Sequence, residues 1–461
     1  MTGLYTIFVV FLLSINVFSQ WVKQNVDTTA SLRGLSVVNE KIVWASGTGG
    51  TVIRTIDGGK TWKVMTVPGG EKLDFRDVEA FDANTAYILS IGNGESSRIY
   101  KTTDGGKTWK EQFRNKNEKA FYDAMACWDR NNCIAMSDPV DGKFVLINTK
   151  DGGANWRAMD TDKMPPAKEG EAAFAASGTC LITQGKNNVF LVTGGSAARV
   201  FRSNNRGLSW FVADTPIVSG SQGSGIFSIA MFDAMNGIIA GGNYERPDVR
   251  NDTFAATTDG GATWKRGATL NGYRSGVTYL DRQIIIAVGT RGGDFSHDRR
   301  VLWKKLGNDN LNSVAAKGRK AIWAVGPNGT VSNLDSRALP KHERFDPNKI
   351  FYPHRSWLNS LTLSHHEVSK TCASSNSDCS DSHRIRIMAS APDIESPHEY
   401  VYTVSAGTVI GNGSNVLWDL TGVKPGKYII TAGISIPVLV SDSRTFWEVL
   451  GKTETKVVVV R

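Results

Sequence analysis

The sequence predicts an all-β protein in which a seven-bladed β-propeller is followed by a small β-sandwich. Three observations lead to this fold class: a short phrase that recurs along the chain, a set of short apolar strands that recurs with it, and a change of pattern after residue 340. The chain has 461 residues, with 47 Gly and 13 Trp, and contains no long amphipathic helical stretch. That composition favours many short strands joined by tight turns.

The recurring phrase has the pattern Thr-x-Asp-Gly-Gly-x-x-Trp and occurs five times, once in a degenerate form at residues 203–210. Its tryptophans are spaced by 47 or 54 residues, which is the length of one four-stranded unit. The aspartate bonds to the backbone of its own turn, the glycines adopt positive φ, and the tryptophan packs between units. We therefore predict structural roles for Asp57, Trp62, Asp104, Trp109, Asp151, Trp156, Trp210, Asp259 and Trp264.

Short apolar strands open the units and give an independent count of seven. Residues 21–340, divided by a repeat of 47 residues, also give nearly seven units. Four-stranded antiparallel sheets repeated radially form a β-propeller. The seventh unit lacks its closing phrase, so we expect residues 21–24 to supply its outer strand and to join the ends of the ring. The opening strands are predicted at 33–37, 76–80, 122–126, 172–176, 227–231, 274–278 and 312–316.

The two ends of the chain differ from the repeats, which fill residues 20–340. Residues 1–19 contain an apolar run that ends in a small residue, which predicts a cleaved signal peptide. We therefore expect a secreted or extracellular protein, periplasmic or at the cell surface in a bacterium, and no later segment that spans a membrane. Residues 341–364 are predicted to form a linker, and the strand spacing in residues 365–461 predicts a β-sandwich.

Export permits disulfides, and five cysteines leave at least one unpaired within the chain. Cys127 and Cys133 flank a turn and are one candidate pair, and Cys372 and Cys379, which close a short loop, are a second. Cys180 then remains as a buried free thiol. No cysteine or histidine spacing indicates zinc, and we expect no metal and no cofactor. Glycosylation sequons begin at Asn251, Asn328 and Asn412.

The formal net charge of +9 favours acidic partners. Because export argues against nucleic acid, we expect a protein or an anionic glycan at the propeller face, bound by a monomer. All seven histidines follow residue 296. Their placement argues against a Ser/His/Asp or Cys/His nucleophile system in the first five units.

The opening strands of a propeller line its central channel, so their first residues are expected to form a ring at one mouth. Arg33, Arg76 and Arg274 would then bind a carboxylate or a sulfate, because guanidinium groups hold such anions bidentately. The alternative is that each arginine pairs with a local acid, such as Asp74 or Asp77 for Arg76, and merely fills the channel. The complete ring is Arg33, Arg76, Tyr122, Ala172, Phe227, Arg274 and Asn312.

The recurring phrase resembles the Asp-box, or BNR repeat, of sialidases, sortilin-type receptors and xyloglucanases. It also resembles the repeats of the photosystem II stability/assembly factor and its secreted relatives. In these families the Asp-box lies at the blade periphery, far from active sites, so the resemblance implies a structural role. The stretch Lys424-Pro425-Gly426-Lys427-Tyr428 resembles PKD- or Ig-like modules, which implies an Ig-like β-sandwich.

The resemblance to the assembly factor implies a non-catalytic binding or assembly scaffold, although nothing in the sequence indicates photosynthesis. The alternative is a sialidase-type glycoside hydrolase acting on an acidic glycan. Sialidases hold the carboxylate of sialic acid with three arginines and use a tyrosine as nucleophile, which invites comparison with Arg33, Arg76, Arg274 and Tyr122. However, Phe75-Arg76-Asp77-Val78 only half matches the Phe-Arg-Ile-Pro motif of sialidases, and these enzymes have fewer blades. Two long loops supply Asp138, Asp141, Glu245 and Asp248, which are candidates for acid/base pairs or for Ca²⁺ ligands.

Overall fold

The chain divides into two compact units, Met1–Lys341 and His342–Arg461. The predicted signal peptide, most of the predicted linker, and Cys372, Cys379 and Asn412 lie outside the described residues. Within those residues, no helix has both the length and the apolar character needed to cross a membrane. The computed structural model describes residues 21–296, 303–335, 339, 360–364, 366–368, 384–390, 399–411, 413–440 and 444–460.

The described residues of the first unit form seven antiparallel sheets, which follow one another along the chain. The first three sheets, each from its inner strand outward, are β2 (Leu32–Val37), β3 (Val43–Gly47), β4 (Thr51–Thr55) and β5 (Lys63–Thr66); β6 (Phe75–Ala80), β7 (Ala86–Ser90), β8 (Arg98–Thr102) and β9 (Lys110–Arg114); and β10 (Tyr122–Cys127), β11 (Cys133–Val140), β12 (Lys143–Thr149) and β13 (Arg157–Ala158). A 3-10 turn, η1 (Gly94–Ser96), precedes β8.

The fourth to seventh sheets continue the same order, except that the fifth carries two extra strands, β14 (Glu171–Ala172) and β17 (Gly194–Gly195). They contain β15 (Leu181–Gln184), β16 (Asn188–Val192), β18 (Arg199–Ser203) and β19 (Phe211–Asp214); β20 (Ser224–Met231), β21 (Gly237–Asn243), β22 (Phe254–Thr257) and β23 (Lys265–Arg266); β24 (Gly276–Tyr279), β25 (Ile285–Gly289), β26 (Gly292–Ser296) and β27 (Lys304–Gly307); and β28 (Ser313–Ala316), β29 (Ile322–Val325), β30 (Val331–Leu334) and β1 (Trp21–Lys23).

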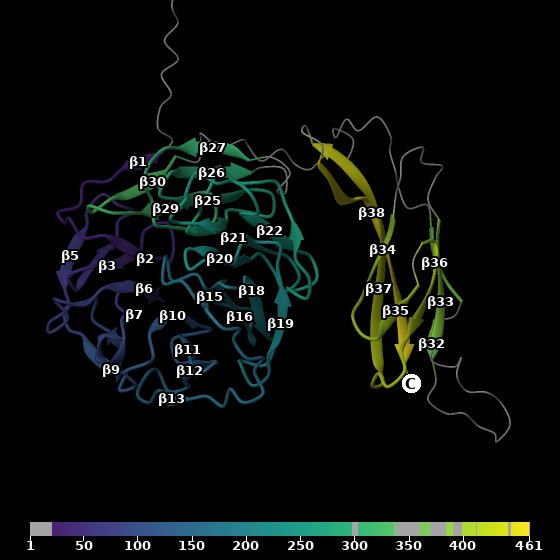
Figure 1. Ribbon diagram of the computed structural model, residues 1–461, viewed down its shortest axis with the longest axis horizontal. Coiled ribbons are helices and arrows are strands. Elements are labelled where there is room, and N and C mark those ends of the chain that lie inside the picture. Colours follow the sequence, from purple (N-terminus) through teal and green to yellow (C-terminus); the bar gives the residue numbers. More distant parts are fainter. Residues whose placement is uncertain are drawn as a thin grey trace, which may run out of the picture. The chain divides into compact units, whose positions relative to one another are not determined.

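The N-terminal strand completes the last sheet, as expected. Strand β1 pairs antiparallel with β30, so that Trp21 lies opposite Leu334 and Lys23 opposite Ser332. Each inner strand contacts the inner strand of the next sheet, and β28 contacts β2, so the sheets close into a ring. Figure 1 shows this ring, with the strands following one another from purple to green in chain order. This arrangement is that of a β-propeller.

The recurring phrase forms the turn between the third and fourth strands of a sheet. At the first copy, Thr55 Oγ1 accepts a hydrogen bond from Gly59 N at 2.9 Å and donates one to Asp57 Oδ1 at 2.8 Å. Asp57 Oδ1 also accepts from Thr61 N at 3.0 Å. The same three bonds recur at residues 102–108, 149–155, 203–209 and 257–263.

The tryptophan that ends each phrase packs toward the preceding sheet. The ring of Trp62 lies 5.4 Å from that of Trp323 in the seventh sheet, and the ring of Trp109 lies 6.5 Å from that of Trp44 in the first. Trp210 and Trp264 are buried in the largest apolar cluster. The phrases therefore join neighbouring sheets at the rim of the propeller.

One predicted strand is wrong. Residues 172–176 do not open the fourth sheet, whose inner strand is β15 (Leu181–Gln184). Instead, Glu171 and Ala172 pair with Gly195 and Gly194 and extend the fifth sheet. The buried carboxylate of Glu171 holds this strand in place by accepting a hydrogen bond from Arg199 Nε at 2.9 Å. Residues 172–176 have the same short apolar pattern as the true opening strands, but they form different contacts.

Cys127 and Cys133 form the predicted disulfide between neighbouring strands β10 and β11, where the two residues are register partners. Cys180 is a buried free cysteine, as expected. Its thiol lies near the inner strands of the second and third sheets. Burial, followed by the negative charges of Asp123 and Asp77, raises the pKa of the Cys180 thiol.

The described residues of the second unit form two four-stranded sheets around one apolar cluster. Buried side chains of both sheets meet in that cluster, including Ile385 and Trp418 from one and Ile430 and Val458 from the other. Its assignment to the Ig-like class stays a prediction. The sheets contain β31 (Ser360–Leu363), β33 (Arg384–Ser390), β36 (Asn415–Asp419) and β35 (Thr408–Ile410), and β32 (Glu367–Val368), β38 (Arg444–Val460), β37 (Gly426–Val440) and β34 (Glu399–Val404).

Candidate binding site at the propeller axis

Four inner strands share an irregularity near their beginning. The pairing register with the second strand shifts at one residue in β2, β6, β10 and β20. Such a bulged residue has no direct partner in the ladder, so its side chain is free to take a new direction. The four bulged residues are Arg33, Arg76, Asp123 and Phe227.

The bulged residues face one segment of chain, residues 173–180, which we call the axial segment. Arg33 Nη1 donates a hydrogen bond to the carbonyl oxygen of Ala176 at 3.0 Å, and Arg76 Nη1 donates one to that of Ala175 at 3.1 Å. The ring of Phe227 stacks on Phe174 with 4.0 Å between centroids.

Further contacts extend across the ring. Ser177 Oγ donates to the carbonyl oxygen of Ser275 in the sixth sheet at 2.7 Å, and Asp138 Oδ1 in the third sheet accepts from Ala173 N at 2.7 Å. Thr179 Oγ1 lies 2.7 Å from Ser228 Oγ in the fifth sheet. One segment therefore contacts five of the sheets, the first, second, third, fifth and sixth, near the axis of the propeller.

Only one of the two arginines is paired with a carboxylate. Arg76 Nε donates to Asp74 Oδ2 at 2.7 Å. Arg33 forms no ion pair within the described residues, and its side-chain hydrogen bond goes to a neutral carbonyl. Burial, followed by the neighbouring charge of Arg76, lowers the pKa of Arg33. This end of the axis therefore carries an excess positive charge, which favours an incoming anion.

Aromatic rings adjoin the arginines. The ring of Tyr244, on the long loop after β21, lies 6.2 Å from that of Phe227 and 6.5 Å from those of Phe174 and Tyr273. Tyr244 is 48% exposed, whereas Phe227 and Tyr273 are buried. Arg33 and Arg76 act electrostatically on Tyr273, whose pKa burial raises. We call this surface the axial mouth, defined by Arg33, Asp74, Arg76, Tyr244 and Tyr273.

Tyr122 and Arg274 belong to the predicted ring but do not face the axial mouth. Tyr122 is buried against Phe113, with 5.3 Å between ring centroids, in the cluster between the second and third sheets. The bulged residue of that strand is Asp123, one position further along. Because side chains alternate between the faces of a strand, an error of one residue places the wrong side chain at the axis.

Arg274 is fully buried in an ion pair with Asp294, in which Nη2 lies 2.6 Å from Oδ2. Its remaining donors bond to the carbonyl oxygens of Tyr273 and Asn271. A guanidinium with these partners is not available to an external anion. The predicted convergence of three arginines is therefore wrong, and two arginines remain at the mouth.

The loop acids that were candidates for acid/base or Ca²⁺ roles lie in separate environments. Asp141 pairs with Lys119 and Asp248 with Arg291, and all four of these side chains are exposed. Asp138 is bonded to the axial segment. Within the described ranges, no group of three or more Asp, Glu, His or Cys side chains is arranged to hold a metal ion.

A group of buried carboxyls lies beside the axial segment, and neither the burial of Asp77 and Asp138 nor the place of Asp123 beside them was predicted. Asp77 Oδ2 accepts a hydrogen bond from Met125 N at 2.7 Å, and burial raises the pKa of Asp77 to about 8. Burial raises the pKa of Asp138 to about 6 and that of Asp123 well above its usual range. Asp77 is therefore mostly neutral near pH 7 and does not cancel the charge of the arginines.

The sequence contains a pattern from which the position of these buried carboxyls could have been predicted. The buried residues Leu32, Phe75, Tyr122 and Ile226 align as the positions just before the bulges. Alignment on these apolar residues, instead of on the arginines, places Asp123 at the axis and Asp77 just beyond the bulge of its strand.

Comparisons with known proteins agree with the propeller. Residues 13–111 match the family model described as photosynthesis system II assembly factor YCF48. A solved structure of YCF48 bound to a D1 peptide is 15% identical, has a TM-score of 0.51, and covers 69% of this chain and 97% of its own. The first unit has the propeller fold of YCF48.

A second structure, YCF48 from Cyanidioschyzon merolae, is 17% identical and has a TM-score of 0.52. It covers 69% of this chain and 99% of its own length. The region that matches the YCF48 family model contains Arg33, Arg76 and the first two Asp-box turns. No curated protein sequence matches the chain.

Proposed function

We propose that this chain is an exported, non-catalytic scaffold with a seven-bladed propeller, and that its axial mouth binds an anionic segment of a protein partner. The observation that carries the proposal is the guanidinium of Arg33, which lies beside a second arginine and has no carboxylate partner within the described residues. A YCF48 structure contains a bound D1 peptide, which supports peptide binding by a propeller of this fold.

The chemistry of the mouth favours a carboxylate. Arg33 and Arg76 now donate to backbone carbonyls, and a carboxylate forms shorter and stronger charge-assisted bonds with the same donors. The half-exposed ring of Tyr244 offers an apolar surface beside that charge. A peptide that ends in an acidic or free carboxyl group and carries an apolar side chain matches both features.

A sialidase-type reaction has less support in this geometry. Of the residues in that hypothesis, Tyr122 is buried between two sheets and Arg274 is held by Asp294. We therefore assign no reaction to the axial mouth and keep the anion-binding role of Arg33 and Arg76.

The test is calorimetric titration of the purified protein with synthetic peptides that differ only in a free or an amidated C terminus. We expect the free carboxylate to bind more tightly, and Arg33→Gln to weaken its binding about tenfold or more, as loss of a charge-assisted bond implies. Arg291→Gln, at an exposed pair outside the mouth, is the matched control. Equal affinities for both peptides, or no effect of Arg33→Gln, would refute the proposal.

A further inference from the structure

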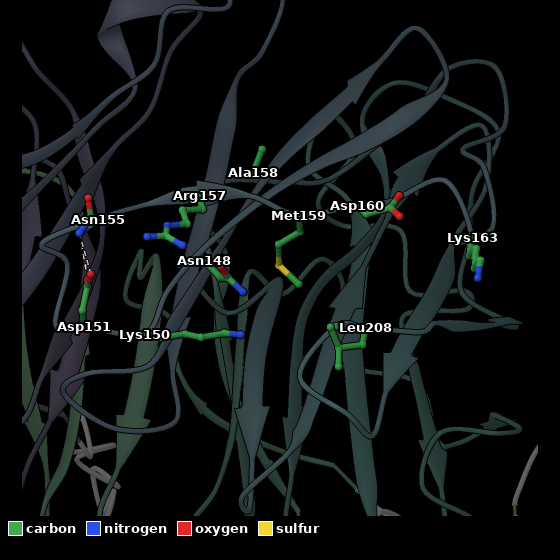
Figure 2. A pocket seen from close by; sticks show the side chains of 11 residues that line it. Asn148, Lys150, Asp151, Asn155, Arg157, Ala158, Met159, Asp160, Lys163 and Leu208 are labelled. Carbon is green, nitrogen blue, oxygen red and sulfur yellow. Dashed lines mark hydrogen bonds between the residues drawn. The ribbon is translucent and has the colours of Figure 1, made fainter.

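A concave surface lies at the rim, between the third and fourth sheets. It is a cavity of about 490 Å³ beside β12 and β13, closed on one side by Gly207 and Leu208 of the fourth Asp-box turn. Figure 2 shows its lining side chains, with Lys150, Arg157, Met159 and Leu208 around one hollow. The axial mouth is built from inner strands, whereas this rim groove is built from outer ones.

The charged side chains of the rim groove leave cations available. Lys150, Arg157 and Lys163 are exposed, and none of them forms an ion pair within the described part of the chain. Asp151 is occupied by its own turn, because its Oδ1 accepts from Asn155 N at 2.9 Å and its Oδ2 from Asn155 Nδ2 at 2.8 Å. Asp160 also lines the groove and is exposed, and its Oδ1 accepts from Asp162 N at 2.9 Å. The groove therefore presents three cations against two carboxylates, and this excess of positive charge favours an acidic ligand.

An apolar side chain stands among these cations without a role in the turn. Leu208 is 73% exposed, although it follows the same Gly position in the fourth Asp-box as Lys60, Lys107, Ala154 and Ala262 do in the other four. Charged and small residues therefore serve equally well in that turn. Met159, which is partly buried, lies beneath Gly207 and continues the apolar surface.

We propose that the rim groove docks an acidic peptide segment of a protein partner that carries one large apolar side chain. The apolar side chain lies on Leu208 and Met159, and the flanking carboxylates pair with Lys150, Arg157 and Lys163. The volume is in the range of sites that hold a short peptide or a small ligand. An acidic glycan would also pair with the cations, but it would gain nothing from the exposed side chain of Leu208. The leucine therefore favours a peptide over a glycan.

Fluorescence anisotropy tests the proposal with a labelled synthetic peptide in which a central Leu is flanked by three Glu on each side. We expect saturable binding that weakens with added salt. Leu208→Ala and Lys163→Glu should each reduce affinity about tenfold, the order of one lost apolar or charged contact. Ala occupies the equivalent position in two other turns, so Leu208→Ala should leave the thermal unfolding transition unchanged.

Controls separate this groove from other sites. A peptide with Ala at its centre should bind more weakly, and Arg33→Gln, at the axial mouth, should leave binding unchanged. Loss of binding in Arg33→Gln would place the peptide at the axis and overturn the proposal. The proposal also fails if Leu208→Ala binds normally, or if a sulfated oligosaccharide binds through Lys150 and Lys163 without any dependence on Leu208.

Discussion

The rim and the axis of the propeller are built from the same repeated sheets. Equivalent positions resemble one another at the rim and differ from one another at the axis. At the rim, five turns form the same three hydrogen bonds, although their sequences vary. At the axis, equivalent bulged positions carry Arg33, Arg76, Asp123 and Phe227. Each rim turn meets only its neighbouring sheets, whereas one axial segment meets five. The rim turns keep one sequence motif because each makes the same local contacts. The bulged positions at the axis carry different residues because each makes a different contact with one central segment.

The two regions also treat aspartate in opposite ways. Hydrogen bonds from Thr61 lower the pKa of Asp57 at the rim to about 2, so this carboxylate stays ionised. Burial raises the pKa of Asp77 at the axis to about 8, so this carboxyl stays neutral at pH 7. One side chain therefore serves as a turn-forming anion in one place and as a buried neutral group in the other.

The largest effect is expected from the buried ion pair behind the axis. Asp294→Ala leaves the guanidinium of Arg274 fully buried without its carboxylate, which should lower the free energy of unfolding by about 3–5 kcal/mol. Urea denaturation followed by tryptophan fluorescence measures the change. Asp248→Ala removes an exposed ion pair with Arg291 and should cost less than about 1 kcal/mol. Similar losses in both variants would contradict this assignment of the buried pair.

A smaller loss is expected where a rim turn touches its neighbouring sheet. Gly59 has a φ of +87°, and a Cβ there would clash with Cη2 of Trp323. Gly59→Ala should therefore combine a left-handed backbone penalty of about 1–2 kcal/mol with an overpacking penalty of about 1–3 kcal/mol.

Gly69 is the matched control for this substitution, because its φ is +74° and no atom lies within 4 Å of the added carbon. Gly69→Ala should show the backbone penalty alone. Thermal unfolding of both variants separates the two contributions. Equal destabilisation would mean that the contact between the turn and the seventh sheet adds nothing.

The sequence predicted the rim well because the rim is encoded locally. The hydrogen-bonded turns, the closing strand at Trp21–Lys23 and the disulfide of Cys127 with Cys133 all follow from short patterns. The phrase turns and the disulfide each need only a turn and the two strands beside it. The closing strand pairs with residues more distant in sequence, and it could be predicted because the seventh unit lacks its own closing phrase.

The axis was predicted less well because its partners are distant in sequence. Residues 172–176 look like the other opening strands, yet the axial segment takes its conformation from contacts with five sheets. Tyr122 and Arg274 precede the residues at the axis by one position. In the strand of Tyr122, the bulge at Asp123 shifts the alternation of side chains without leaving a clear mark in composition.

Stability should depend on pH in opposite directions for the two kinds of aspartate. The unfolded chain releases the proton of Asp77 near pH 4, whereas the folded protein keeps it up to about pH 8. The stability contributed by this group should therefore fall as pH rises from 4 to 8. Asp77→Asn keeps a neutral side chain and should remove at least about 1 kcal/mol of that decline.

Asp57 gives the contrasting result at acid pH. Its contribution is present above about pH 4 and is lost as pH falls toward its folded-state pKa of about 2. Asp57→Asn should therefore lose less stability on acidification than the unsubstituted protein. Urea denaturation of both variants from pH 3 to pH 9 tests the pair, and a parallel pH dependence in the two variants would contradict the assigned ionisation states.

The smallest effects test additivity. Thr102 and Thr257 each accept a bond from a glycine N–H at 2.9 Å in separate rim turns. Thr102→Val and Thr257→Val should each cost about 1 kcal/mol, and the double variant should lose the sum within about 0.5 kcal/mol.

At the axis, Thr179 Oγ1 and Ser228 Oγ lie 2.7 Å apart and belong to one network, since Ser228 Oγ also accepts from Val277 N at 3.0 Å. Thr179→Val and Ser228→Ala should therefore lose clearly less together than the sum of their separate losses, because either change alone breaks the bond they share. Additive losses at the axis would mean that independent contacts hold the axial segment. The rim and the axis would then differ in sequence but not in the cooperativity of their contacts.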